Sequence, residues 1–171
     1  MSFVIRAAGP DDVSSLLRLI RELARFEKLE HEVVATEETL RESLFGRDAG
    51  AEALLGIDED RPIGFALFFF NYSTFLGRRG LYLEDLFVEP AHRGKGYGKQ
   101  LFQRVIRIAN ERNCHRLDWA VLDWNQRAID FYKSLGAKPL SDWTLFRLNH
   151  TEIRLQSDMT NGTSRRQDHE S

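Results

Sequence analysis

The sequence predicts a mixed α/β fold in a single domain. Stretches with the composition of β-strands alternate with stretches in which apolar residues recur at helical spacing, which is typical of a sheet flanked by helices. The chain has 171 residues, of which 42% are hydrophobic and 29% charged, so it can bury a core and has a globular composition. We place the domain at residues 1–155. Residues 156–171 are expected to be disordered, since Met159 is their only apolar residue.

The first predicted elements are a strand and two helices. Residues 3–6 predict a short strand. A helix follows, because apolar residues recur at helical spacing from Val13 to Ala24, and the acidic residues just before them suit the positive end of a helix dipole. A second helix begins near Thr36, whose side chain can cap the first turn.

Three further strands come next. Residues 51–57 and 63–70 predict two strands joined by a turn at residues 58–61. The second of these strands is nearly all apolar, which places it in the centre of the sheet. Residues 81–88 predict another strand, which Pro90 closes because proline cannot donate to a sheet ladder.

The remaining elements follow a glycine-rich segment. Apolar residues from Leu101 to Ala109 lie on one face of a predicted helix, and residues 117–122 predict a strand. Residues 125–135 predict a short helix that ends at Gly136, a residue that favours the C-cap position. Residues 143–148 predict a last strand.

Composition and charge exclude several classes of protein. The formal net charge is −2, so no basic nucleic-acid footprint covers the domain. Cys114 is the only cysteine, which excludes an internal disulfide and fits a reducing compartment. The N-terminal segment lacks the apolar core of a signal peptide, and the longest apolar run, residues 65–70, is too short to span a bilayer. No histidine has metal-ligand spacing to a cysteine or an acid. We therefore expect a cytoplasmic protein without a membrane, nucleic-acid or metal partner.

The segment RGKGYG, residues 93–98, places three glycines directly before a helix. The glycines can form a simple strand-to-helix turn, or they can let backbone N–H groups approach an anion at the helix N-terminus. In the second case Arg93, Lys95 and Lys99 add positive charge for a phosphate or pyrophosphate. The Walker pattern GxxxxGK[ST] and the dinucleotide pattern GxGxxG are both absent. Asp118 lies near the position of a ribose-binding acid, so nicotinamide binding remains an alternative.

In the order of its motifs, the chain resembles the GNAT superfamily of acetyl-CoA-dependent N-acetyltransferases. RGKGYG fits the family's R-x-x-G-x-G loop, the strand LYLEDLFV (81–88) precedes it, and WNQRAIDFYKSLGA (124–137) fits the second cofactor segment. The resemblance spans residues 3–148 and points to the diamine (spermidine/spermine) acetyltransferases and their thialysine-acetylating relatives. It implies a GNAT fold with a mixed, mostly antiparallel central sheet flanked by helices. It also implies acetyl-CoA as co-substrate, a small-molecule primary amine as acceptor, and a homodimer.

The resemblance assigns a set of cofactor-binding residues. Backbone amides from Arg93 to Lys99 wrap the pyrophosphate of coenzyme A, and backbone groups at the end of strand 81–88 pair with its pantetheine arm. One of those amides polarises the acetyl carbonyl. Asn125 contacts the cofactor, although it can also serve only as a helix N-cap. The cofactor-binding residues implied in this way are Leu86, Phe87, Val88, Arg93, Gly94, Lys95, Gly96, Tyr97, Gly98, Lys99, Asn125, Arg127 and Ala128.

The resemblance also implies two catalytic residues. A tyrosine among apolar neighbours is by default a core residue, but the family places Tyr132 beside the cofactor sulfur as the acid that protonates the leaving thiolate. Glu84 lines the amine site, where it attracts the ammonium group and, through water, helps to remove its proton. Neighbouring strand residues face opposite sides of a sheet, so Asp85 cannot share the face of Glu84 and is expected to be structural. The implied substrate-binding residues are Phe26, Glu27, Glu84, Asp118 and Trp119.

Three other functions fit the same sequence. The first is a GNAT enzyme that acts on a protein amine, an aminoglycoside or an amino acid. The second is a non-catalytic sensor that binds acyl-CoA, and the third is the nicotinamide-binding enzyme mentioned above. Residues 138–142 are shorter than the acidic loop that polyamine acetyltransferases have at this point, and Asp142 replaces only part of its charge.

Overall fold

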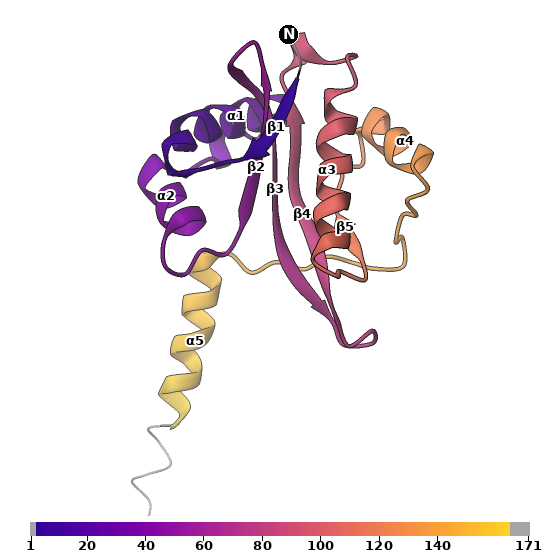
Figure 1. Ribbon diagram of the computed structural model, residues 1–171. Coiled ribbons are helices and arrows are strands. Elements are labelled where there is room, and N and C mark those ends of the chain that lie inside the picture. The colour runs from indigo at the N-terminus through magenta and orange to yellow at the C-terminus, as the bar shows by residue number, and fades with distance from the viewer. Residues whose placement is uncertain (1–2, 165–171) are drawn as a thin grey trace, which may run out of the picture. The chain divides into compact units, whose positions relative to one another are not determined.

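The computed structural model describes residues 3–164, in two compact units that divide between Leu122 and Asp123 (Figure 1). The N-terminal unit contains the elements β1 (Val4–Ala7), η1 (Pro10–Asp12), α1 (Val13–Phe26), η2 (Glu30–Glu32), α2 (Glu37–Phe45), β2 (Glu52–Asp58), β3 (Arg61–Ser73), β4 (Arg78–Val88), η3 (Pro90–His92), α3 (Tyr97–Glu111) and β5 (Leu117–Trp119). The C-terminal unit contains α4 (Gln126–Ser134) and α5 (His150–Ser164). The prediction of one domain over residues 1–155 stays a prediction.

The sheet of the N-terminal unit has the strand order β1-β2-β3-β4-β5 within the described residues. All neighbouring strands are antiparallel except β4 and β5, which are parallel. This arrangement confirms the prediction of a mixed, mostly antiparallel sheet flanked by helices. Strand β3 lies in the centre, as its apolar sequence indicated, because both of its faces are covered.

Helices cover both faces of this sheet. In Figure 1, α1 and α2 lie on one face and α3 lies on the other. On the first face, Leu16 and Leu19 of α1 are fully buried in a core that includes Leu55 of β2, Phe65 of β3 and Phe87 of β4. Alternate residues of each strand point to opposite faces, so one strand contributes to both cores.

The helix starts agree with the sequence prediction. Thr36 caps α2, since its hydroxyl accepts a hydrogen bond from the backbone N–H of Thr39 at 3.2 Å. Asn125 caps α4 in the same way, accepting from the backbone N–H of Ala128 at 3.3 Å. Gly136, just beyond α4, has the left-handed φ of 87° that favours glycine after a helix.

Two predicted elements differ in the structure. Residues 143–148 form no strand, and the side chains of Trp143 and Phe146 are largely exposed. Strand β5 covers only Leu117–Trp119 of the predicted 117–122. Helix α5 covers His150–Ser164 and so includes the first part of the segment expected to be disordered, residues 156–171. Residues 165–171 lie outside the described part of the chain, and the expectation of a disordered tail stays a prediction. Among residues 3–164, no helix combines the length and apolar character that a membrane crossing needs.

Gly64 allows β3 and β4 to approach closely, so a side chain at this position should destabilise the fold. A Cβ atom at this buried position would lie 2.7 Å from the carbonyl oxygen of Phe87, a backbone atom that cannot turn away. Gly64→Ala should therefore lower the free energy of unfolding by about 1–3 kcal/mol, measured by urea denaturation.

Gly50→Ala is the matched control. A Cβ there meets nothing within 4 Å, so this variant should unfold like the wild-type protein or be slightly more stable. Equal stability of the two variants would contradict the close approach at Gly64.

Candidate functional site

A β-bulge at Glu84 determines how the acidic residues of β4 are presented. Leu67 of β3 lies opposite Asp85, and Phe68 lies opposite Leu83, so Glu84 has no partner in the register. Bulges of this kind re-aim side chains and are frequent beside functional sites. The strict alternation that we assumed from the sequence is therefore broken between Glu84 and Asp85.

Three carboxylates gather around this bulge, and we call them the acidic trio: Glu27, Glu84 and Asp85. Glu84 is exposed, whereas Asp85 is half-buried opposite Leu67, on the face that α1 covers. Burial, and then the negative charges of Glu84 and Glu27, raise the pKa of Asp85 to about 7. Burial also raises the pKa of Glu27, the C-cap residue of α1. At neutral pH the trio can thus attract a cation and exchange a proton with it.

Arg93 connects the glycine segment to the C-terminus of α1. Its guanidinium lies over the ring of Phe26, 4.3 Å from the centroid, and 5.5 Å from the centroid of Phe87. Its Nε donates a hydrogen bond of 2.9 Å to the carbonyl oxygen of Val88. The structure therefore brings together Phe26 and Glu27, assigned to the substrate, and Arg93, assigned to the cofactor.

The glycine segment forms a loop with two left-handed residues. Gly94 and Gly96 have φ of 83° and 80°, which L-residues rarely adopt. Gly98 differs, because it lies in the first turn of α3 without a positive φ, and a Cβ there would meet nothing closer than the Val88 side chain at 3.9 Å. Backbone conformation therefore explains why Gly94 and Gly96 are glycines. Gly98 has no such reason, and its missing side chain leaves space at the N-terminus of α3. Lys99 is exposed in the same turn.

The end of β4 offers an open backbone edge. Strand β5 pairs only with Leu81–Leu83, so within the described residues β4 has a strand partner on one side alone from Glu84 to Val88. The side chains of Phe87 and Val88 are buried and that of Leu86 is half-buried, and their role in binding the cofactor stays a prediction. An extended ligand can add to such an edge as a further strand.

In the C-terminal unit, the predicted residues lie on and beside α4. Tyr132 is half-buried with its ring 5.1 Å from that of Phe131, and burial raises the pKa of its phenol to about 12. The phenol is therefore protonated throughout the physiological range, as an acid must be. Asn125 and Ala128 form the N-cap hydrogen bond, and Arg127 is exposed.

Two predicted substrate residues have other contacts. Asp118 forms an ion pair with Arg116, with 3.0 Å between Oδ2 and Nε. Trp119 packs edge-on against Phe102 of α3, with 5.1 Å between ring centroids. These contacts do not involve the acidic trio, so a substrate role for Asp118 and Trp119 stays a prediction. The described residues also contain no cluster of three or more His, Cys, Asp or Glu side chains able to hold a metal ion.

Sequence reasoning missed Asp58, which we assigned to a turn. It is the last residue of β2, is 8% exposed, and contacts Tyr97 and Lys95 of the glycine segment. The available signal was an acidic residue at the end of a predicted strand, but a local sequence pattern does not reveal its partners.

Comparison with known proteins identifies relatives over most of the chain. The profile of the acetyltransferase (GNAT) family matches residues 16–137. A thialysine N-epsilon-acetyltransferase of Bos taurus is 41% identical over 166 residues, covering 90% of this chain and 97% of the relative. An L-ornithine N5-acetyltransferase of Arabidopsis thaliana is 34% identical, and the match covers 84% of this chain and 83% of the relative. The structure of an integron cassette protein from the mobile metagenome of V. cholerae matches with a TM-score of 0.77 at 28% identity. The match covers 92% of this chain and 98% of that protein.

The raised pKa of Asp85 predicts how stability depends on pH. The folded chain binds this proton more tightly than the unfolded chain, because the pKa is about 7 instead of the ordinary 3.8. The stability that Asp85 contributes is full below about pH 4 and is lost as the pH rises through about 7. Asp85→Asn should therefore be more stable than the wild type at about pH 8, by up to about 4 kcal/mol, with the difference shrinking toward pH 4.

Urea unfolding across this pH range measures the effect. Asp48→Asn, at an exposed position in the loop after α2, is the control and should follow the wild-type curve. A difference between Asp85→Asn and wild type that does not change with pH would show that Asp85 is ionised already in the acid range.

Proposed function

The chain belongs to the GNAT family of acetyltransferases, which use acetyl-CoA as co-substrate, and on that basis we propose that it acetylates a primary amine of a small, positively charged molecule. The acceptor is a thialysine- or lysine-like compound or a di- or polyamine. The transfer is direct, within a ternary complex of enzyme, acetyl-CoA and amine.

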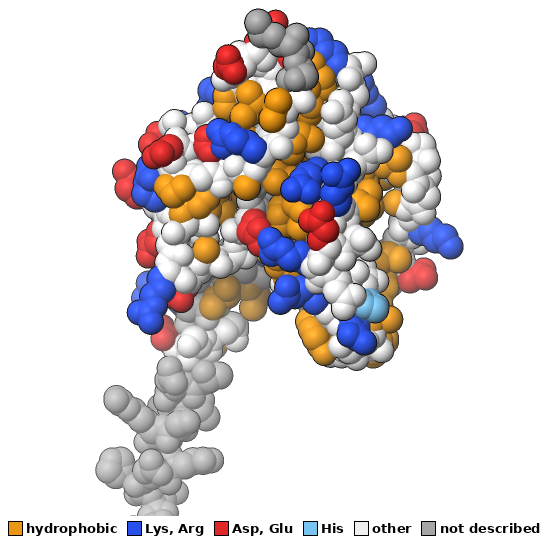
Figure 2. All heavy atoms as spheres, viewed as in Figure 1, with side chains coloured by type: hydrophobic (Ala, Val, Ile, Leu, Met, Phe, Trp, Pro, Cys, Tyr) orange, Lys and Arg blue, Asp and Glu red, His pale blue; other side chains and the backbone are white. Residues whose placement is uncertain are grey.

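The acidic trio is the observation that carries the choice of acceptor. Three carboxylates around the bulge of β4 attract an ammonium group. Burial, and then the negative charges of Glu84 and Glu27, raise the pKa of Asp85, so a cation bound there would favour its ionised form. Figure 2 shows basic and acidic side chains interspersed over the face that it presents, so this attraction is local. The names of the relatives, which refer to thialysine and L-ornithine, support amines at the end of a cationic side chain.

The loop and the open strand edge support coenzyme A as the second ligand. At the N-terminus of α3 the first backbone N–H groups have no partner within the helix and attract an anion such as pyrophosphate. Gly98, which neither conformation nor packing explains, leaves space for that anion. The edge from Glu84 to Val88 offers backbone groups to the pantetheine arm.

The proposed reaction needs one group that accepts a proton from the amine and another that donates a proton to the leaving thiolate. The sequence assigned the first step to Glu84, but the raised pKa favours Asp85, with Glu84 as the charge that attracts the ammonium. The free amine attacks the acetyl carbonyl, and a backbone N–H of β4 stabilises the oxyanion. The C–N bond forms, the C–S bond breaks, and Tyr132 gives its proton to the leaving sulfur.

The acid role of Tyr132 is tested with Tyr132→Phe. Removal of the hydroxyl leaves the ring and its packing in place, so kcat should fall by about 10²-fold while the Kd for coenzyme A changes little. Tyr72→Phe, at an exposed tyrosine of β3, is the control and should keep the wild-type kcat. An unchanged kcat in Tyr132→Phe would remove Tyr132 from this role.

The two carboxylates of β4 are expected to differ in their kinetic effects. Asp85→Asn should lower kcat by about 10²-fold and abolish the rise of kcat/KM through about pH 7, because the residue can no longer accept a proton. Glu84→Gln should mainly raise the KM for the amine. The reverse pattern would return the base role to Glu84.

Thiol release from acetyl-CoA, followed with a thiol-reactive dye, tests the proposed function itself. The acceptors are thialysine, lysine, ornithine, putrescine, spermidine, a histone-tail peptide and no amine. Turnover with one of the small cationic amines supports the proposal. Binding of acetyl-CoA without turnover on any acceptor would favour a sensor, and turnover only with the peptide would favour a protein acceptor.

A further inference from the structure

Asp58 contacts three donors through a single oxygen atom. Its Oδ2 accepts from the hydroxyl of Tyr97 at 3.1 Å, and it lies 3.3 Å from Nδ1 of His92 and 3.6 Å from Nζ of Lys95. Burial opposes ionisation, but the hydrogen bonds from Tyr97 and His92 and the charge of Lys95 hold the pKa of Asp58 below its ordinary value. The carboxylate is therefore charged when it binds these donors.

Two of these donors stand at the two ends of the glycine loop. His92 is the last residue of η3, just before the loop, and Tyr97 is the first residue of α3, just after it. The two glycines of the loop contribute no packing, since a Cβ at Gly94 or Gly96 would meet nothing within 4 Å. Glycines lose much conformational entropy on ordering, so other residues have to fix the geometry of this segment.

The position of Asp58 is itself well defined. It pairs with Arg61 across a two-residue turn, in which Glu59 and Asp60 have φ of 49° and 61°. Such tight turns fix the register of a hairpin. Tyr97 is held from a second side as well, because its ring stacks on Phe3 with 4.0 Å between centroids and 8° between planes.

We infer that Asp58 is a positioning residue, which clamps both ends of the loop at residues 93–96 and holds that loop ready for the pyrophosphate of coenzyme A. This inference rests on the proposed function, because it requires that the loop binds coenzyme A. Asp58 acts through His92, Lys95 and Tyr97.

The charge of Asp58 makes the inference sharply testable. A carboxylate beside an anion-binding loop repels the anion, so electrostatics alone predicts that its neutralisation strengthens binding. If Asp58 instead holds the loop in shape, its neutralisation should weaken the binding of coenzyme A. Asp58→Asn keeps the shape of the side chain but removes the charge that the three donors share.

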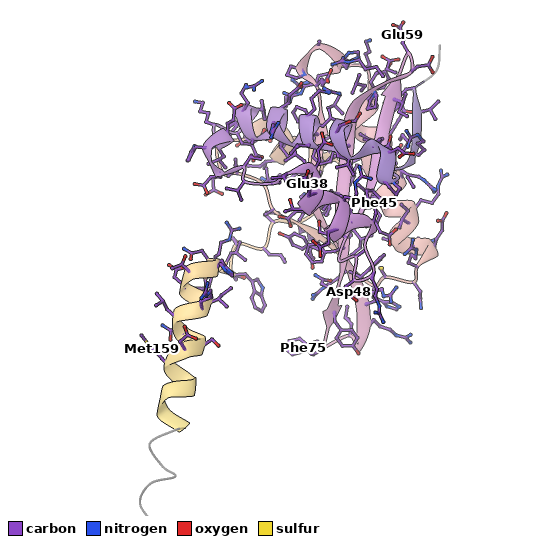
Figure 3. All side chains as sticks on the ribbon, turned by 90° about the vertical axis from the view of Figure 1, so that its left-hand side faces the viewer. Glu38, Phe45, Asp48, Glu59, Phe75 and Met159 are labelled. Carbon is purple, nitrogen blue, oxygen red and sulfur yellow. The ribbon has the colours of Figure 1, made fainter. Side chains whose placement is uncertain are left out.

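The experiment measures the Kd for coenzyme A by titration calorimetry, and kcat and both KM values for the acetyl-CoA and amine pair. In Asp58→Asn, the Kd for coenzyme A and the KM for acetyl-CoA should rise about tenfold, with kcat and the KM for the amine within about twofold of wild type. Glu59→Gln is the matched control, since it removes the same charge from the next, exposed residue, which projects from the tip of the turn (Figure 3). It should bind coenzyme A as the wild type does or slightly more tightly.

Tyr97→Phe provides a second, independent variant. It removes one donor of the clamp and keeps the ring that stacks on Phe3, so it should weaken coenzyme A binding by several-fold. The double variant Asp58→Asn with Tyr97→Phe should bind coenzyme A only slightly more weakly than Asp58→Asn alone, because both changes break the same interaction.

The outcomes separate this inference from the function on which it rests. No binding of coenzyme A by the wild-type protein would overturn both. Wild-type binding together with equal or tighter binding by Asp58→Asn would overturn the clamp alone. A fall in kcat and a rise in the KM for the amine as large as the change in the KM for acetyl-CoA would also overturn it, because a general loss of structure affects all three.

Discussion

The buried carboxylate of Glu89 fixes the end of strand β4, on which the candidate site is built. Glu89 is 5% exposed, and Arg61 of β3 donates two hydrogen bonds of 2.8 Å to it, with a further ion pair from Arg18 of α1. Its backbone N–H donates to the carbonyl of Ile63 at 2.9 Å. A buried charge persists only when it is paired in this way, so three elements converge on one point. The short helix η3 begins directly after that point and leads into the glycine loop.

From this fixed end, the course of β4 explains why one strand can serve two ligands. The bulge at Glu84 interrupts the register beside Asp85, which is close enough to Glu27 at the C-terminus of α1 for their charges to interact. Beyond Leu83, strand β5 no longer pairs with β4. Two members of the acidic trio, Glu84 and Asp85, therefore lie on the same stretch of β4 as the open backbone edge. An acetyl group bound along that edge would lie close to an amine held by the carboxylates, which is the geometry that direct transfer requires.

The sequence predicted the order and nature of most elements, because helical and strand periodicities reflect burial directly. It failed where pairing decides the structure. Residues 143–148 have a strand pattern without a partner strand, and the bulge at Glu84 is a property of register with β3, so its effect on Asp85 could not be derived. Asp58 was assigned to a turn because its partners, His92 and Tyr97, lie 34 and 39 residues away in the sequence. Local patterns identify the loop but not what holds it.

Arg93 is the remaining link between the two halves of the proposed site in the N-terminal unit. Its backbone belongs to the loop, while its guanidinium lies on Phe26 and donates to the carbonyl of Val88. A partly exposed cation–π contact contributes about 0.5–1 kcal/mol, and a hydrogen bond from a charged donor about 1.5–3 kcal/mol. Arg93 therefore ties the loop to the acceptor side, whereas Glu89 and Asp58 fix where the loop begins and how its ends are held. A loop with two left-handed glycines can keep one shape because residues of α1, β2 and β3 anchor it on several sides.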